Sequence, residues 1–263
     1  MIGVAEGETS MIYDLQKASV WKRFAAWLLD NILVSILVVG IAFLLSSVLG
    51  YDHYSDRVSE IYDQYEAKYG VSFTVGPDEY ESWTEEERQT FDQAYQELVS
   101  DEEAMYAYNM TVNLTMVVTS LSILIAVVAL EFVVPLLFKN GQTVGKKIFS
   151  LCVIRIDCVK MNNLQLFTRS VLGKFAIETM IPIYILLMFF WGIMDLIGLV
   201  ILVALVFAEL IILIATRKNQ AIHDLLAGTA VADYSSQMIF GSSEDLTEYK
   251  KKIHAEIAAR QEY

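Results

Sequence analysis

The stretch VWKRFAAWLLDNILVSILVVGIAFLL, residues 20–45, decides the fold class of this chain. A helix needs about 20 apolar residues to cross roughly 30 Å of hydrocarbon, and this stretch supplies them. Arg23 and Asp30 interrupt it, and ionisable side chains within a membrane span usually face a protein interior or a wet cavity beside a partner. The stretch therefore predicts a transmembrane helix, and these two charges are its first indication of function.

Three further apolar windows follow, at residues 112–138, 175–191 and 196–216. The 263-residue chain is 55% hydrophobic and contains three prolines, a composition typical of a membrane protein. We predict an all-α, polytopic membrane protein with four transmembrane helices. The third window is the shortest, so three spans with one re-entrant segment are an alternative.

The net charge of −13 belongs to one segment of the chain. Residues 51–110 contain 16 acidic side chains and three basic ones, whereas the rest of the chain contains 16 of each. Those other basic residues lie before residue 24, between residues 139 and 174, or after residue 216. Because Lys and Arg are in excess in cytoplasmic segments, we expect a plasma membrane protein with both termini cytoplasmic and the acidic segment extracellular.

The predicted organisation alternates membrane and surface segments. It comprises a cytoplasmic N-terminus (1–17), a first transmembrane helix (18–50), an acidic extracellular helical insertion (51–111), a second transmembrane helix (112–138), a cytoplasmic interfacial segment (139–174), the third and fourth transmembrane helices (175–216), an interfacial segment (217–234) and a cytoplasmic tail helix (235–263). Within the first interfacial segment, the alternation of residues 151–157 predicts a short strand.

The acidic insertion is predicted to fold into helices, the last of which runs on into the second span. Residues 55–69 place apolar and aromatic side chains at helical intervals. Thr84 with Glu87, and Ser100 with Glu103, match the capping box that opens a helix. We expect either a small helical cap packed on its own aromatic residues, or a surface that binds an extracellular protein partner or attracts cations.

Four carboxylates are predicted to occupy one layer in the cytoplasmic half of the membrane. At about 1.5 Å per residue, Asp30, Glu131 and Glu209 lie about 10 Å from the cytoplasmic ends of their helices, and Glu178 lies about 6 Å from its end. We expect no basic residue at that depth. In a shared interior, repulsion and desolvation would favour neutral carboxyl groups, so protons or bound cations would neutralise the layer. This arrangement predicts a proton-binding or cation-binding site.

The alternative is a structural role, in which each acid bonds to a helix end, a backbone group or a nearby base. Arg23, Ala26 and Asp30 lie on one helical face, and the small Ala26 allows a neighbouring helix to approach. Asp30 lies roughly 10 Å deeper than Arg23, so we expect a second partner for Asp30. Asp224 is predicted to reach a base such as Arg23 or Lys146 at a cytoplasmic gate. The gate or charge partners predicted are Arg23, Lys174, Arg217 and Asp224.

The chain shows no pattern typical of a membrane enzyme. It contains neither Gly-x-Ser-x-Gly nor His-Glu-x-x-His. The stretch GQTVGKK, residues 141–147, fails as a phosphate loop because its glycines are one residue too close and Lys147 stands where Ser or Thr is required. Cys152 and Cys158 are expected to be reduced thiols without a zinc site. We therefore expect no enzymatic activity, no cofactor or metal, and no nucleic-acid partner.

Three motifs, taken in order, resemble the RDD family of bacterial membrane proteins. They are RxxAxxxD at Arg23, Ala26 and Asp30, TxGK at Thr143, Gly145 and Lys146, and RKNQAIHDLLAGTAV at residues 217–231, which contains His223 and Asp224. The arginine and the two aspartates for which the family is named correspond to Arg23, Asp30 and Asp224.

The resemblance also has departures and implications. The family pattern has glycine where Ser150 and Cys158 stand, and it lacks the acidic insertion and the lysine-bearing tail of this chain. These differences indicate a specialised member. Transport roles, including cation/proton exchange, have been proposed for some members, so the resemblance implies transport without naming a species.

The sequence leaves two functions open. The first is binding or transport of a small cation or proton in a carboxylate-lined, cytoplasm-facing cavity, with Asp30 as the central carboxylate and with Glu131, Glu178 and Glu209 assisting. The second is a non-transporting accessory or scaffold protein whose acidic residues 51–110 bind a partner. Four spans in the lipid bilayer could conduct only as a homo-oligomer or around a narrow cavity. The lack of a visible inverted repeat favours the second function.

Overall fold

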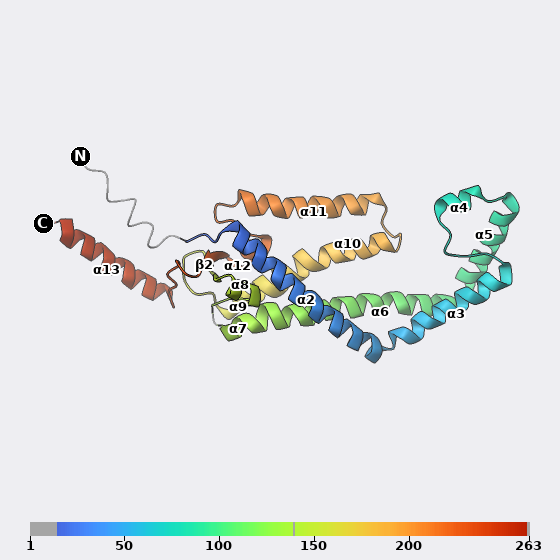
Figure 1. Cartoon of the computed structure of the whole chain (residues 1–263), viewed down its shortest axis with the longest axis horizontal. Coiled ribbons are helices and arrows are strands. Elements are labelled where there is room, and N and C mark those ends of the chain that lie inside the picture. Colours follow the sequence, from blue (N-terminus) through green and yellow to red (C-terminus); the bar gives the residue numbers. More distant parts are fainter. Residues whose placement is uncertain (1–14, 139, 262–263) are drawn as a thin grey trace. The chain divides into compact units, whose positions relative to one another are not determined.

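A computed structural model describes residues 15–138 and 140–261 of the chain. Within those residues, four helices are long and apolar enough to cross a membrane (Figure 1). They are α2 (Val20–Leu49); a run of α6 (Glu102–Val127), η1 (Val128–Val133) and α7 (Val134–Phe138); a run of α9 (Asn163–Phe167), η2 (Thr168–Met180) and α10 (Ile181–Phe190); and α11 (Leu196–Ala215). The prediction of an all-α membrane protein with four candidate spans is confirmed.

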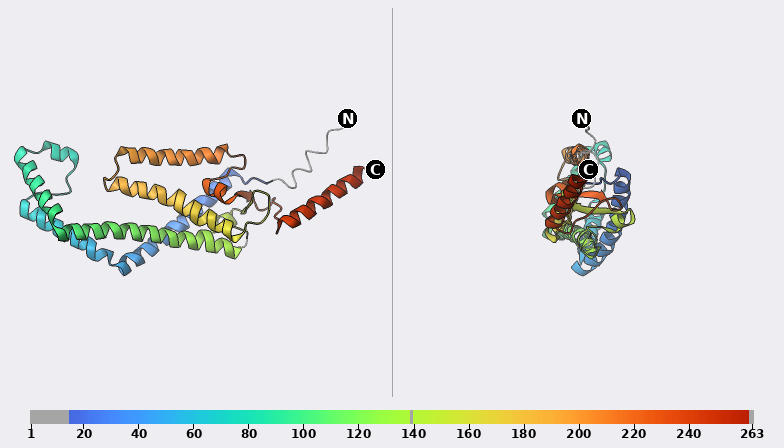
Figure 2. Two further views of the ribbon diagram at one scale, coloured as in Figure 1. Left: turned by 180° about the vertical axis from the view of Figure 1, so that it is seen from behind. Right: turned by 90° about the vertical axis from the view of Figure 1, so that its left-hand side faces the viewer.

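The third long helix begins at Asn163 and not at residue 175, where its apolar window begins. Figure 2 shows α9, η2 and α10 as one continuous run. Arg169 and Lys174 therefore lie inside a candidate span, and the expected interfacial segment over residues 139–174 ends earlier. A search for apolar residues stops at such cations. The helix continues through them because both are paired inside the fold.

Two of the long helices contain π-helical turns, in which the backbone bond runs from i to i+5. One is η1 in the second run, and the other is the 13-residue η2 in the third run. Turns of this kind appear frequently at functional sites. The two π-helical segments carry four charged residues that recur below: Glu131, Arg169, Lys174 and Glu178.

The chain divides into two compact units, which we call the sheet unit (residues 1–38 and 123–263) and the acidic unit (residues 39–122). The acidic unit contains α3 (Tyr51–Tyr69), α4 (Pro77–Ser82), α5 (Glu85–Ser100) and the first part of α6. Its core is formed by Ile61, Leu98, Ala104 and Ala107, with an aromatic group beside it in which the Phe91 ring lies 5.5 Å from that of Trp83.

The helix starts in the acidic unit agree with one predicted capping box and correct the other. Thr84 accepts the Glu87 amide, and the Glu87 carboxylate accepts the Thr84 amide in return. The box predicted at Ser100 is wrong. Asp101 caps α6 instead, accepting the Glu103 amide at 2.8 Å, while the Ser100 hydroxyl donates back to a carbonyl of its own helix. A carboxylate is the stronger acceptor for helix N–H groups.

The sheet unit is named for two antiparallel strands, β1 (Leu151–Arg155) and β2 (Thr229–Asp233). Each strand follows a short helix, α8 (Val144–Ile148) or α12 (Ile222–Ala227), and α13 (Ser243–Gln261) follows β2. The strand predicted within residues 151–157 is present as β1. The segment 217–234, expected to be interfacial, contains both α12 and a strand, because part of it pairs with β1. Burial raises the pKa of the Cys152 thiol on β1 to about 12, which keeps it unreactive.

Residues 141–155 and 219–233 are two copies of one backbone unit. Each copy opens on a left-handed residue, Gly141 (φ 62°) or Asn219 (φ 52°). Each copy then has a glutamine, a short helix, a second left-handed residue and a strand. These features follow in the same order and at the same spacing in both copies. Gln142 donates to the Leu151 carbonyl at 2.7 Å, and Gln220 donates to the equivalent Thr229 carbonyl at 2.6 Å.

The strand register relates the two copies by an approximate two-fold axis. Val153 pairs with Val231, and these residues are equivalent in the two copies. Ser150 and Cys158, where the family pattern has glycine, both adopt positive φ, 54° and 66°. Their backbone thus has the left-handed conformation that glycine adopts most easily. The duplication was missed in the sequence because few side chains match between the copies.

Candidate functional site

Asp30 of α2 holds the start of α8. Its carboxylate is 4% exposed and accepts the Gly145 amide at 2.7 Å and the Thr143 hydroxyl. The Lys146 ammonium lies 3.6 Å from the same carboxylate. Thr143 in turn accepts the Lys146 amide as the N-cap of α8. The TxGK motif therefore gives Asp30 a hydrogen-bonded partner and a charge partner.

Gly145 is required by the close approach of α8 to α2. A Cβ at this position would collide with the Ala26 carbonyl oxygen and would lie 2.9 Å from Asp30 Oδ1. Ala26 itself is 1% exposed. The small residues of the first two family motifs therefore bring the two backbones together, so that the aspartate can reach the N–H groups of the short helix.

Glu178 of η2 does for α12 what Asp30 does for α8. It accepts the His223 amide at 2.7 Å and bonds the His223 ring through Nδ1 at 2.6 Å. His223 and Gly145 are equivalent residues, each second in its short helix. Gly173 of η2 permits the approach, because a Cβ there would lie 2.6 Å from His223 Cβ. The duplication thus extends to the acids that the membrane helices contribute.

An arginine precedes each of these acids by two helical turns. Arg23 lies seven residues before Asp30, about two turns of an α-helix. Arg169 lies nine residues before Glu178, roughly two turns of the wider π-helix. Arg23 Nη1 donates to the Asn219 carbonyl at 2.6 Å. Each arginine therefore reaches from a membrane helix into the second copy of the duplicated unit.

Asp224 pairs with Arg169. The distance from Arg169 Nε to Asp224 Oδ1 is 2.9 Å, and both side chains are buried. The predicted pairing of Asp224 with Arg23 or Lys146 is wrong, because Arg23 bonds the Asn219 carbonyl and Lys146 faces Asp30. Arg169 was missed in the sequence, since it lies outside the apolar window. Its two-turn spacing from Glu178 is a signal only if the helix is known to be π-helical.

One oxygen of Asp224 is buried without a hydrogen-bond partner among the described residues. Oδ1 accepts from Arg169 and from the Thr229 hydroxyl, whereas Oδ2 lies 3.7 Å from His223 Nε2. Burial raises the pKa of Asp224, but the Arg169 guanidinium outweighs burial and holds the pKa well below its usual range. Asp224 is therefore ionised, with one oxygen available.

Glu131 of η1 is the second buried acid with a spare oxygen. It is 1% exposed, and Oε1 pairs with the Lys174 ammonium, while Oε2 has no partner within the described chain.

Two bases lie near Glu131. Lys146 is one of them: burial lowers its pKa, and the negative charges of Glu131 and Asp30 oppose that effect. Lys174 is the other. The prediction that no basic residue lies as deep as the acids is wrong, because Lys174 pairs with one of them directly.

The hydrogen bonds of His223 fix its tautomer. Arg169 Nη2 lies 2.9 Å from His223 Nε2, and a guanidinium can only donate. Nε2 therefore accepts, so the ring proton is on Nδ1 and is donated to Glu178. His223 is thus neutral and lies between an acid and a base that both belong to η2.

We call these residues the charge centre. Its acids and bases balance, with four of each beside a neutral histidine: Asp30, Glu131, Glu178 and Asp224, and Arg23, Lys146, Arg169 and Lys174.

Glu209 and Arg217 do not bond to the charge centre. Glu209 is half-buried on α11 and Arg217 is exposed, and neither side chain has a hydrogen bond or ion pair with another described residue. The sequence grouped Glu209 with the other acids by depth alone. The structure brings three of the four predicted acids, Asp30, Glu131 and Glu178, into contact with short helices or bases.

Among the described residues, no group of three or more His, Cys, Asp or Glu side chains is placed to hold a metal ion. Two hollows in the sheet unit are lined by other residues, and the acids of the charge centre contribute to neither of them.

Comparison with known proteins agrees with the motifs and the geometry. The model of the RDD family matches residues 17–228, which contain the whole charge centre and both copies of the short helix, α8 and α12. Neither the curated proteins nor the solved structures gave a match. The match covers most of the chain and joins the three motifs with four membrane-length helices. The chain belongs to the RDD family and is an integral membrane protein.

Proposed function

We propose that the charge centre binds a proton and that the protein couples proton binding to the transport of a small cation. The observation that carries this proposal is the position of His223. It is neutral, it bonds Arg169 through Nε2, and the same nitrogen lies 3.7 Å from the spare oxygen of Asp224. Histidine is the side chain whose charge changes most readily near neutral pH.

A proton arriving at Nε2 would exchange the partners of three residues. An imidazolium donates from both nitrogens, so Nε2 can no longer accept from Arg169 and turns to Asp224 Oδ2 instead. Arg169 Nη2 is released, and the buried Glu131 offers Oε2, which lacks a partner in the described part of the chain. One proton therefore rearranges the contacts between η1, η2 and α12.

The duplication also supports a transport role. In transporters built from repeats, the sites for substrate and coupling ions lie where the repeats meet. The charge centre connects the two copies, since Arg23 bonds the first residue of the second copy and Asp30 bonds the first copy. Among the positions at which the copies differ is the second of the short helix, where the first copy has Gly145 and the second has His223.

We place the protein in a bacterial plasma membrane with both termini in the cytoplasm. The distribution of basic residues supports the orientation, because the acidic residues 51–110 carry a net charge of −13 and the other surface segments hold the lysines and arginines. The bacterial origin rests on the family resemblance. In this orientation the charge centre and the sheet face the cytoplasm.

Proteoliposomes test the proposal directly. Under imposed sodium, potassium and pH gradients, the native protein should exchange protons for a cation, and His223→Gln should abolish the exchange while retaining the fold. His254→Gln on the exposed face of α13 is the matched control and should behave as native. Absence of flux under every gradient with the native protein would refute transport.

An accessory role is the second candidate, and the acidic unit favours it. This unit has its own apolar core and aromatic group and exposes most of its acidic side chains. Replacing residues 55–105 by a Gly/Ser linker should then leave the melting of the sheet unit unchanged and remove a co-purifying protein. A partner that still co-purifies with the shortened chain would argue against this role.

A further inference from the structure

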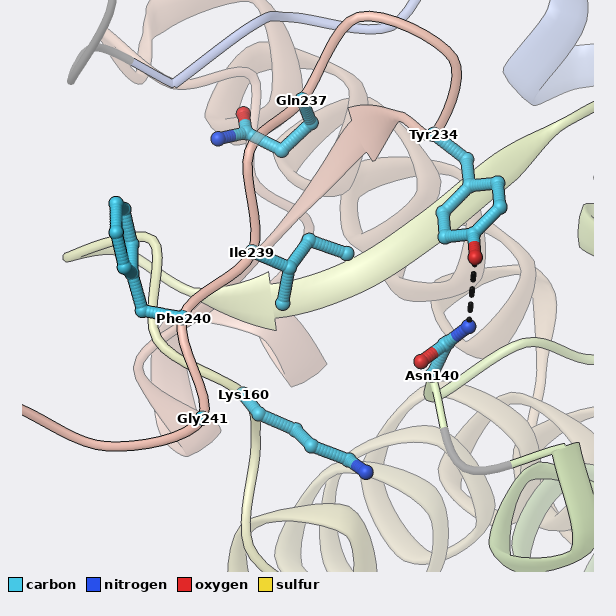
Figure 3. A pocket seen from close by; sticks show the side chains of 7 residues that line it. All are labelled: Asn140, Lys160, Tyr234, Gln237, Ile239, Phe240 and Gly241. Carbon is cyan, nitrogen blue, oxygen red and sulfur yellow. Dashed lines mark hydrogen bonds between the residues drawn. The ribbon is translucent and has the colours of Figure 1, made fainter. Parts of the chain in front are cut away.

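Two neighbouring hollows in the sheet unit share one lysine. The larger has a volume of about 500 Å³ and is lined by polar and aromatic residues together with one isoleucine and one glycine (Figure 3): Asn140, Lys160, Tyr234, Gln237, Ile239, Phe240 and Gly241. The smaller, of about 120 Å³, is more apolar and is lined by Pro135, Leu136, Gly141, Lys160, Met161, Asn162, Asn163 and Leu166. Lys160 therefore lines both hollows, and the smaller one, which we call the apolar hollow, has four apolar side chains beside its polar ones: Pro135, Leu136, Met161 and Leu166.

Both hollows lie at the ends of candidate membrane spans. Asn140 follows the second long helix, which ends at Phe138, and Lys160 precedes the third, which begins at Asn163. Pro135 and Leu136 belong to the last turns of the second helix. Because the ends of membrane spans lie where lipid head groups meet acyl chains, we place the two hollows at that level.

The polar hollow offers donors for a phosphate group. The Lys160 ammonium has three N–H donors, and within the described residues it makes no hydrogen bond or ion pair. Asn140 donates to the Tyr234 hydroxyl at 3.2 Å, which leaves the hydroxyl proton free to donate onward. Figure 3 shows the Lys160 side chain extending toward the side of the hollow on which Asn140 lies.

We propose that these hollows bind one anionic phospholipid. Its phosphate would bind Lys160, its polar head group would occupy the larger hollow, and an acyl chain would lie along Leu136 and Met161 in the smaller one. Basic pockets beside transmembrane helices on the cytoplasmic side bind anionic head groups in this way. A soluble phosphate compound shares the chemistry of the first hollow, but it would leave the apolar hollow unused.

Lipid binding to the purified full-length protein in mild detergent tests the proposal. We expect dioleoylphosphatidylglycerol to bind more tightly than dioleoylphosphatidylcholine, as measured by native mass spectrometry. Lys160→Ala should weaken the binding of the anionic lipid about fivefold, which is the effect of one cation near a lipid phosphate. The variant should also lose the preference for the anionic lipid over dioleoylphosphatidylcholine. Lys251→Ala replaces an exposed lysine of α13 and is the matched control, which should keep the preference for the anionic lipid.

A second variant separates the two hollows. Leu136→Trp should fill the apolar hollow and weaken lipid binding without changing the charge of the site. Equal binding of the two lipids by the native protein, or an unchanged preference in Lys160→Ala, would overturn the proposal. So would glycerol 1-phosphate binding as tightly as the lipid, because the apolar hollow would then contribute nothing.

Discussion

Arg169 is the residue on which the burial of Asp224 depends. Removing one partner of a buried ion pair leaves an uncompensated charge, which costs about 3–5 kcal/mol. Arg169→Met, which is similar in length and uncharged, should therefore lower the free energy of unfolding by about that amount in detergent-based denaturation. The double variant Arg169→Met with Asp224→Asn should recover part of the loss, because no charge remains unpaired.

The control for this prediction is Arg217→Met. Arg217 is exposed, so its replacement should change the free energy of unfolding by no more than about 0.5 kcal/mol. A loss at Arg169 as small as that at Arg217 would show that Asp224 is not held by this pair.

Asp233 gives a pH-dependent contribution at the end of β2. The Lys22 ammonium, 2.7 Å away, and the Ser235 hydroxyl lower the pKa of Asp233 to about 2. A carboxyl whose pKa is lower in the folded state stabilises the fold above its unfolded pKa of about 4, and this effect is lost as the pH falls toward the folded value.

The difference in melting temperature between the native protein and Asp233→Asn should therefore be constant from pH 7 to about pH 5 and should disappear between about pH 4 and pH 2. Because Lys22 is partly exposed, salt should reduce the difference as well. A difference that persisted at pH 2 would exclude this ion pair as its source.

At the residue level, the sequence predicted the acids better than their partners. Asp30, Glu131 and Glu178 were found because a carboxylate in an apolar window is conspicuous. Lys174 was among the predicted charge partners and pairs with Glu131, whereas the partners of Asp30 and Glu178 were missed because pairing depends on the path of the chain between spans. Lys146 and Thr143 reach Asp30 only because α8 turns back against α2.

The short helix α8 is an element that its contact with α2 holds in place. Gly145→Ala would put a methyl group against the Ala26 carbonyl and the Asp30 carboxylate, both of which belong to a packed helix. Overpacking of this kind costs typically about 1–3 kcal/mol, so the melting temperature should fall. The Asp30 bonds to the start of α8 should weaken at the same time.

Gly40→Ala is the matched control for this prediction. Gly40 lies in the interior of α2, and no atom lies within 4 Å of the point that an added methyl group would occupy. Alanine is also the better helix former, so the replacement should leave the melting temperature unchanged or raise it. Equal effects at Gly145 and Gly40 would contradict the close approach of α8 to α2.

The element that sequence patterns describe least well is η2. Its π-helical turns place Arg169 and Glu178 two turns apart, although nine residues separate them. A search at the α-helical period of about 3.6 residues puts these side chains on different faces. The number of membrane-length helices was therefore predictable, whereas the π-helical turns and the face of the third helix that meets α12 were not.

For the molecule as a whole, the duplication makes a prediction about matched substitutions. Gln142 and Gln220 each donate to the first carbonyl of a strand and are buried to a similar degree. Gln142→Leu and Gln220→Leu should each leave a buried carbonyl unsatisfied and cost about 1–3 kcal/mol in the free energy of unfolding, by similar amounts.

An exposed glutamine in the acidic unit, Gln64, is the control, and Gln64→Leu should have no effect beyond about 0.5 kcal/mol. A loss at one of the two equivalent glutamines and not at the other would show that the copies share a backbone path without sharing its energetics.

The two copies are related by an approximate two-fold axis, as the partners in a symmetric dimer are. In a dimer of identical chains any substitution is made twice, so a histidine at the second position of the short helix would also replace the glycine that lets α8 touch Ala26. Two copies within one chain are free of that constraint. The first copy keeps Gly145 against α2, while the second carries His223 at the equivalent position, so an approximately symmetric backbone holds an asymmetric set of side chains.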